Sequence, residues 1–170
     1  MPEDIVADAT VLIFLGKLRR LDWLRETYDR VLVPSTVHEK VVERGKEMGA
    51  PDATRVAAAI DDGWIEVREV EPREDIAAYD LEAGETEVLS LALANGHDEV
   101  LVDEESVREV ARLHDTQPRG TLSFLFAAVE RGEITFEEFI ELLETLLEAG
   151  SYLDESIYLK AVRKARRLAE

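Results

Sequence analysis

Four acidic side chains in this 170-residue chain have a type and spacing that suit metal-assisted hydrolysis. Each of them follows an apolar run or opens a helical stretch, and the four are Asp8, Glu39, Glu85 and Asp103. Carboxylates that meet in one crevice raise one another's pKa, and a divalent cation removes this cost. Mg²⁺ and Mn²⁺ favour oxygen ligands, and two such ions about 3.5–4 Å apart can activate water in phosphodiester cleavage. The spacing is therefore compatible with a metal-dependent hydrolase site.

A purely structural role for these acids is the alternative. The chain has 38 acidic residues, so some fall at strand ends by chance, and an Asp that follows a strand is often a helix cap. An acid in the first turn of a helix, such as Glu85, is favoured by the helix dipole. Asp8 and Asp103 are the most specific of the four, because both directly follow apolar runs. His38 is expected to face solvent or a partner rather than to bind a metal.

The elements that must position these acids alternate between strand and helix. Strands are expected at 5–7, 30–33, 64–70 and 99–102, and helices at about 11–18, 22–27, 36–46, 52–61, 84–94, 104–114, 119–131, 136–148 and 155–168. Short apolar runs separated by helices predict an α/β fold with a parallel sheet. Sites in such sheets lie beyond the carboxyl ends of the strands, where several of the acids fall.

The composition excludes several other kinds of chemistry. The chain has no cysteine, which excludes disulfides, iron–sulfur clusters, cysteine zinc sites and a cysteine nucleophile. Its three histidines are scattered, which disfavours a histidine-rich metal site. It has no GxxxxGK[ST] loop, which disfavours NTP hydrolysis. No apolar run approaches the ~18–20 residues that span a bilayer, and the first residues carry acids where a secretory signal is basic. A cytoplasmic protein that does not enter a membrane is expected.

The net charge of the chain affects whether it can bind a nucleic acid. Twenty basic and 38 acidic residues give a net charge of −18, which should repel a nucleic acid at ordinary ionic strength. Arginine outnumbers lysine and the acids are spread along the chain, a pattern similar to that of proteins from haloarchaea and other salt-accumulating organisms. At molar salt the Debye length is ~3 Å, so net charge no longer decides the partner. We expect a halophilic protein, with an ordinary acidic protein as the alternative.

Four sequence blocks, in the expected order, resemble the PIN-domain superfamily, and most closely its small prokaryotic, VapC-like members. The blocks are VADATVLIFLGKLRRLDWL, VLVPSTVHEKVV, LEAGETEVLSLAL and VLVDEESVREVARLHDTQPRGTLSFLFAAVERG. The resemblance implies a three-layer α/β/α fold with a central parallel sheet of about five strands. It also implies a nuclease domain over 1–132, after which 133–170 would form a helical extension packed on the same domain.

The resemblance also implies residue roles. Its metal-binding and catalytic acids match Asp8, Glu39, Glu85 and Asp103, although many relatives have Asp where this chain has Glu85. Supporting positions match Thr10 and Thr121, and Glu104, the neighbour of Asp103, is expected to assist or replace it. Phosphate contacts are expected from Arg108 and Arg119. The alternatives are a helix-capping role for Thr121 and pairing of the two arginines with neighbouring acids.

The expected function is that of a Mg²⁺- or Mn²⁺-dependent endoribonuclease in which metal-activated water hydrolyses the phosphodiester. The resemblance suggests the toxin of a toxin–antitoxin pair, with RNA, a cognate antitoxin and a second copy of the chain as partners. Lys160 and Arg163 in the basic C-terminal sequence are candidate RNA contacts, or cations that oppose a helix dipole. The apolar stripe of 136–148 suits packing on its own domain or, alternatively, a dimer or antitoxin surface. A PIN fold that binds RNA or protein without catalysis is the main alternative function, and a small-molecule phosphatase is less favoured because DATVL carries one Asp only.

Overall fold

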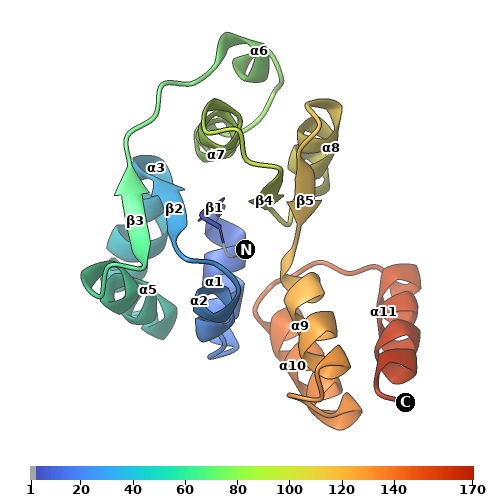
Figure 1. The fold of residues 1–170 in the computed structure, drawn as a ribbon. Coiled ribbons are helices and arrows are strands. Elements are labelled where there is room, and N and C mark those ends of the chain that lie inside the picture. The colour runs from blue at the N-terminus through green and yellow to red at the C-terminus, as the bar shows by residue number, and fades with distance from the viewer. Residues whose placement is uncertain (1–2) are drawn as a thin grey trace. The chain divides into compact units, whose positions relative to one another are not determined.

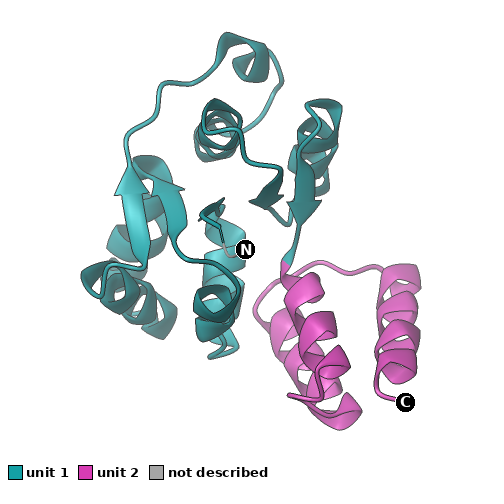
Figure 2. Ribbon diagram, in the orientation of Figure 1, with its two compact units in different colours: residues 1–120 teal, residues 121–170 magenta. Residues whose placement is uncertain are grey.

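The computed structural model describes residues 3–170 and is drawn as a ribbon in Figure 1. Contacts divide the chain into two compact units, residues 1–120 (unit 1) and 121–170 (unit 2), which Figure 2 colours separately. The sequence predicts a nuclease domain over 1–132 and a helical extension over 133–170. This division refers to function as well as to packing, and it stays a prediction. Within the part of the chain that the structure describes, no helix is long and apolar enough to cross a membrane.

Unit 1 alternates strands and helices, as the sequence predicts. Its strands are β1 (Ile5–Val6), β2 (Val31–Pro34), β3 (Ile65–Arg68), β4 (Glu99–Leu101) and β5 (Gln117–Arg119). Its longer helices are α1 (Ala9–Lys17), α2 (Asp22–Thr27), α5 (Pro51–Asp61), α7 (Ala83–Ala94) and α8 (Glu105–Leu113). The expected helix over 36–46 is broken into α3 (Ser35–His38), the π-helical turn η1 (Glu39–Glu43) and α4 (Arg44–Glu47), and α6 (Glu74–Ala77) is a single short turn.

The strands form two parallel sheets rather than one. Strands β1, β2 and β3 make a three-stranded sheet in that order, and β4 pairs with β5. An isolated parallel bridge between Ala7 and Leu101 connects the two sheets, where the Asp8 N–H donates to the Leu101 carbonyl at 2.9 Å. The expectation of about five strands in one sheet is therefore wrong in this form. Strand β1 is only two residues long and the chain enters α1 at Ala9, so little extended backbone remains to pair with β4.

Apolar side chains from the strands form the core of unit 1. Val6, Val31 and Val100 are fully buried, and α7 packs against β1, β2 and β4 while α5 packs against β3. Burying each such side chain contributes roughly 1.5–3 kcal/mol. The expectation that the continuous apolar runs are buried strands is confirmed by this packing.

Strand β5 was not expected from the sequence. Its residues, Gln-Pro-Arg, have none of the apolar character of the other strands, and a helix was expected from 119. The helix α9 begins two residues later, at Thr121. Proline lacks the N–H that a central strand needs, and β5 is the outer strand of its sheet, where Pro118 lies opposite Val100.

Unit 2 consists of the three helices α9 (Thr121–Glu130), α10 (Phe136–Glu148) and α11 (Glu155–Leu168). Thr135 caps α10 in a capping box with Glu138, whose N–H donates to Thr135 Oγ1 at 3.0 Å. The rings of Phe126 and Phe139 stack with centroids 5.5 Å apart, and Lys164 Nζ lies 4.5 Å from the Phe126 centroid. The helices expected at 136–148 and 155–168 are therefore confirmed.

Candidate active site

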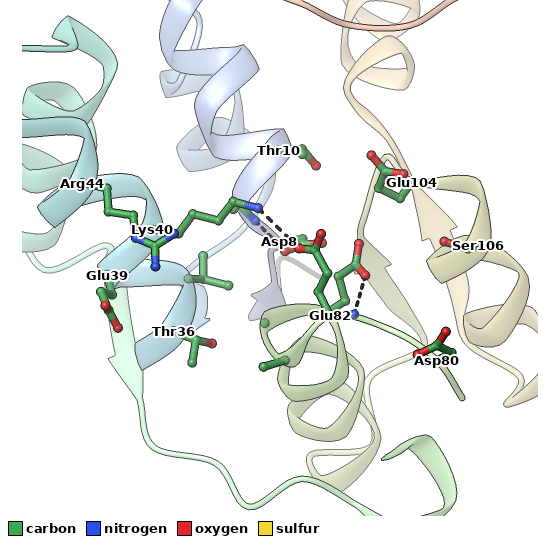
Figure 3. Close-up of a pocket in the computed structure, with 15 residues that line it drawn as sticks. Asp8, Thr10, Thr36, Glu39, Lys40, Arg44, Asp80, Glu82, Glu104 and Ser106 are labelled. Atoms are coloured by element: carbon green, nitrogen blue, oxygen red, sulfur yellow. Dashed lines mark hydrogen bonds and ion pairs between the residues drawn. The ribbon is translucent and has the colours of Figure 1, made fainter. Parts of the chain in front are cut away.

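A pocket of about 530 Å³ in unit 1 gathers polar residues that follow β1, β2 and β4 or open α7 (Figure 3). The carboxyl ends of parallel strands meet at one edge, which brings these distant segments together. The acidic lining residues are Asp8, Glu39, Asp80, Glu82, Glu85 and Glu104. The basic ones are Lys40 and Arg44, and those with hydroxyl groups are Thr10, Thr36 and Ser106.

Asp8 is the most buried acid of the pocket. It is the N-cap of α1, its Oδ1 accepts the Ala9 N–H at 2.7 Å, and the residue is 5% exposed. Burial raises the pKa of Asp8 to about 6, and the Ala9 hydrogen bond opposes this rise. The negative charges of Glu85 and Asp103 raise the pKa further, and the positive charge of Lys40 lowers it. Glu85 and Asp103 are therefore both close enough to Asp8 to act on it electrostatically.

Glu85 enters this cluster from the first turn of α7. Its Oε1 accepts the Glu82 N–H at 3.0 Å in a capping box, which is a structural role beyond the favourable interaction with the helix dipole considered from the sequence. The side chain is half-buried, and burial raises the pKa of Glu85, with contributions from the charges of Glu82 and Glu104. A methyl group on Gly84 would lie 3.6 Å from Thr36 Oγ1, which shows how closely the start of α7 approaches α3.

Asp103 follows β4 and lies beside the chain that leaves β5. A Cβ atom on Gly120 would lie 2.8 Å from Asp103 Oδ1 and 3.1 Å from Arg108 Nη1, so only glycine fits there without displacing a neighbour. Asp103 is half-buried and is not among the pocket's lining residues, although its charge reaches Asp8. Gly120 thus holds open the space that the Asp103 carboxylate occupies.

Glu39 is not brought together with the other three acids. It lines the edge of the pocket, but its side chain is exposed and points away from Asp8 (Figure 3). The next residue, Lys40, instead reaches into the pocket, where its Nζ lies 3.7 Å from Glu82 Oε2. A role for Glu39 as a metal ligand stays a prediction. The sequence interpretation missed Lys40, although neighbouring residues on a helix point about 100° apart, so Glu39 and Lys40 do not both point toward Asp8.

The remaining predicted residues of unit 1 are divided between the pocket and the structure around it. Thr10 and the exposed Glu104 line the pocket, and Thr10 Oγ1 is buried without a hydrogen-bond partner among the described residues. Arg108 donates to the Val102 carbonyl at 3.1 Å and lies 3.8 Å from Glu105. Arg119 donates to Tyr28 Oη at 3.0 Å. Neither arginine lines the pocket, so contact of either with a phosphate stays a prediction.

Three predicted residues belong to unit 2. Thr121 is buried at the start of α9, and Lys160 and Arg163 are exposed on α11. Exposure on a basic helix is compatible with the RNA contact expected for Lys160 and Arg163, which stays a prediction.

The donor set of the pocket suits a hard divalent cation. Its carboxylates and the unpartnered hydroxyl groups of Thr10 and Thr36 are oxygen ligands, which Mg²⁺ and Mn²⁺ prefer. Across residues 3–170, no three Asp, Glu or His side chains are placed to hold an ion as they stand. Binding therefore requires side-chain movement, most simply rotation of Glu85 away from the Glu82 N–H.

The chain was also compared with known proteins. A family model described as a PIN domain, DUF3368, matches residues 4–167, and the comparison with curated proteins finds no match. The match covers nearly all of the 170 residues, and it includes the pocket and unit 2 as far as residue 167. The chain therefore belongs to the DUF3368 family of PIN domains, a fold that is in general that of nucleases using divalent metal ions.

Proposed function

We propose that this protein is a Mg²⁺- or Mn²⁺-dependent endoribonuclease. The observation that carries the proposal is the position of Asp8, a buried acid held by the Ala9 N–H and influenced by the charges of Glu85 and Asp103. An ionised, buried carboxylate with acidic neighbours lowers the stability of the fold unless a cation neutralises it, so such a group is typical of a functional site. Membership of the PIN-domain family supports nuclease chemistry at this pocket.

In this proposal, Asp8, Glu85 and Asp103 hold the metal. The bound ion supplies a Lewis acid that activates water and neutralises negative charge on the phosphate. The Ala9 N–H fixes the orientation of the Asp8 carboxylate, and burial keeps that carboxylate from rotating into solvent. Gly120 leaves room for Asp103 to approach. With a pKa of about 6, Asp8 is mostly ionised at pH 7 and can serve as a ligand.

We further propose that the substrate is RNA and that the protein is the toxin of a toxin–antitoxin pair with a small cognate antitoxin. The exposed cations of α11, Lys160 and Arg163, suit contact with a phosphate backbone. A net charge of −18 opposes such contact at low ionic strength, so we propose that the protein acts in the molar salt of a halophile's cytoplasm. Exposed Ile157 and Leu159 on the same helix suit a second copy of the chain or the antitoxin.

The test is cleavage of single-stranded RNA at about 2 M and about 0.1 M KCl, with Mn²⁺, with Mg²⁺ and with EDTA. We expect cleavage that needs metal, is faster at high salt and is lost in Asp8→Asn and Asp103→Asn. Lys46→Met, which changes an exposed residue outside the pocket, serves as the control and should cleave as wild type does. Wild-type rates in both Asn variants would refute the site, and a DNA oligomer of the same sequence tests the preference for RNA.

A second function is favoured by a specific observation. Lys40 extends among the acids and Glu39 points outward, so the pocket as it stands lacks a ready set of three ligands. This arrangement suits a PIN fold that binds RNA or a protein partner without cleaving it. Gel-shift binding of RNA at high salt, with no cleavage after prolonged incubation with Mn²⁺, would favour this second function.

A further inference from the structure

Lys40 has a position in the pocket that metal binding by the acids does not explain. It belongs to η1, a π-helical turn in which the Arg44 N–H donates to the Glu39 carbonyl, and such turns are frequent at functional sites. Its side chain runs from this turn across the pocket toward Asp8 and ends 3.7 Å from the carboxylate of Glu82, the N-cap of α7 (Figure 3). The ammonium group therefore connects two separate segments of the pocket wall.

The charges around Lys40 are mostly negative. Six acidic side chains line the pocket, against only two basic ones, Lys40 and Arg44. The charge of Lys40 acts on both Asp8 and Glu85, and in each case it favours the ionised carboxylate. Lys40 thus partly neutralises the negative charge of these acids, as a metal ion would. Its partner Glu82 is 74% exposed, so the Lys40–Glu82 contact alone is weak and does not account for the position.

We propose that the ammonium group of Lys40 is a built-in cation of the active site that takes the place of one metal ion, so that the pocket binds a single divalent ion. The proposal rests on the proposed function, because it assigns the metal to the same pocket. The side chain of Lys40 is 47% exposed, but its charge acts on Asp8, which is 5% exposed, so solvent screens that part of the site less. A second divalent ion beside Asp8 would be repelled by Lys40 and would have to displace it from the acids. In a one-ion site, Lys40 also remains close to the space in which a phosphate would lie.

The test is titration of the purified protein with Mn²⁺ by isothermal calorimetry at about 2 M KCl. We expect one ion for wild type. Lys40→Met removes the competing charge and should tighten binding of that ion by about two- to fivefold, since Lys40 is exposed and the salt screens its charge. Lys40→Glu adds a carboxylate at the same place and should raise the number of bound ions to two. Lys46→Met and Lys46→Glu make the same changes outside the pocket and should bind as wild type does.

The outcomes separate this proposal from the proposed function. Two ions bound by wild type, together with Mn²⁺-dependent cleavage, would overturn the role of Lys40 and leave the nuclease assignment standing. Equal affinity in Lys40→Met and Lys46→Met would also overturn it. Absence of both Mn²⁺ binding and cleavage would refute the proposed function and the ion count with it. Thermal unfolding in EDTA gives a metal-free readout, in which Lys40→Met should melt below Lys46→Met because Asp8 and Glu85 lose their counter-charge.

Discussion

Replacement of Asp8 by Asn should abolish metal-dependent cleavage and, at the same time, stabilise the metal-free protein above pH 6. Burial is the main reason that the pKa of Asp8 is about 6 instead of 3.8. Between these pH values the folded protein keeps a proton that the unfolded chain has released, so the free energy of unfolding falls as the pH rises from about 4 to about 6. Above pH 6 the whole cost of the ionised, buried carboxylate is present.

The size of the effect follows from the shift. About two pKa units correspond to ~3 kcal/mol, which is the upper limit for the stabilisation by Asp8→Asn at pH 7.5. The amide oxygen of Asn can still accept the Ala9 N–H that Asp8 accepts at 2.7 Å, so the helix cap is retained. For a chain of this length each kcal/mol moves the melting temperature by roughly 2–4 °C, so the upper limit is a rise of roughly 6–12 °C.

The assay is urea and thermal unfolding of wild type and Asp8→Asn in EDTA at pH 4.5, 6 and 7.5. The variant's advantage should be largest at pH 7.5 and shrink toward pH 4.5. Asp52→Asn is the matched control, because Asp52 is 4% exposed but has a cationic partner, Lys17, at 3.4 Å. That variant should not gain stability. An Asp8→Asn protein that is less stable than wild type at pH 7.5, or a difference that does not change with pH, would contradict the reasoning.

Four further outcomes are expected. Asp103→Asn should abolish Mn²⁺-dependent cleavage while changing the free energy of unfolding in urea by less than about 1 kcal/mol. Glu39→Gln should keep cleavage within about tenfold of wild type, because its side chain points away from Asp8, and a loss as large as that of Asp103→Asn would return Glu39 to the ligand set. Gly120→Ala brings a methyl group to 2.8 Å from Asp103 Oδ1 and should weaken Mn²⁺ binding, measured by calorimetry, by about tenfold or more with an unchanged circular dichroism spectrum. At limiting Mn²⁺ the cleavage rate should rise as the pH passes through about 6, since the metal binds the ionised Asp8, and a flat profile between pH 5 and 7.5 would count against that ligand.

The strands of unit 1 could be predicted from the sequence where a continuous apolar run forms the strand. The runs around Val31 and Val100 are continuous and apolar, and both became buried strands. Gln117–Arg119 could not be recognised in this way, because its extended conformation comes from pairing with β4 rather than from its own side chains. The number of strands in one sheet could not be predicted either. It depends on the short stretch between Val6 and the start of α1 at Ala9, which leaves little extended backbone to pair with β4.

The positions of the site residues could be predicted from the sequence at the ends of strands, but not within a helical segment. Asp8 and Asp103 each lie two residues beyond the end of a strand, β1 and β4, so the strands fix their positions closely. Glu39 and Lys40 are adjacent on a helical segment, and which of them faces the pocket depends on the helix phase. The π-helical turn alters that phase, and its i→i+5 hydrogen bond has no counterpart in the hydrophobic pattern of the sequence.

Among the described residues, the isolated bridge between Ala7 and Leu101 is the only strand pairing across the junction of the two sheets, and α7 packs against strands on both sides of it. Asp8 comes directly after one side of this junction and Asp103 shortly after the other, so separation of the sheets would pull the two carboxylates apart while leaving both sheets paired within themselves. An ion bound by both residues would link the two sheets across this junction. Metal loading would then slow hydrogen exchange of the Asp8 amide more than that of amides inside β2, which ties the local opening of the fold to the occupancy of the pocket.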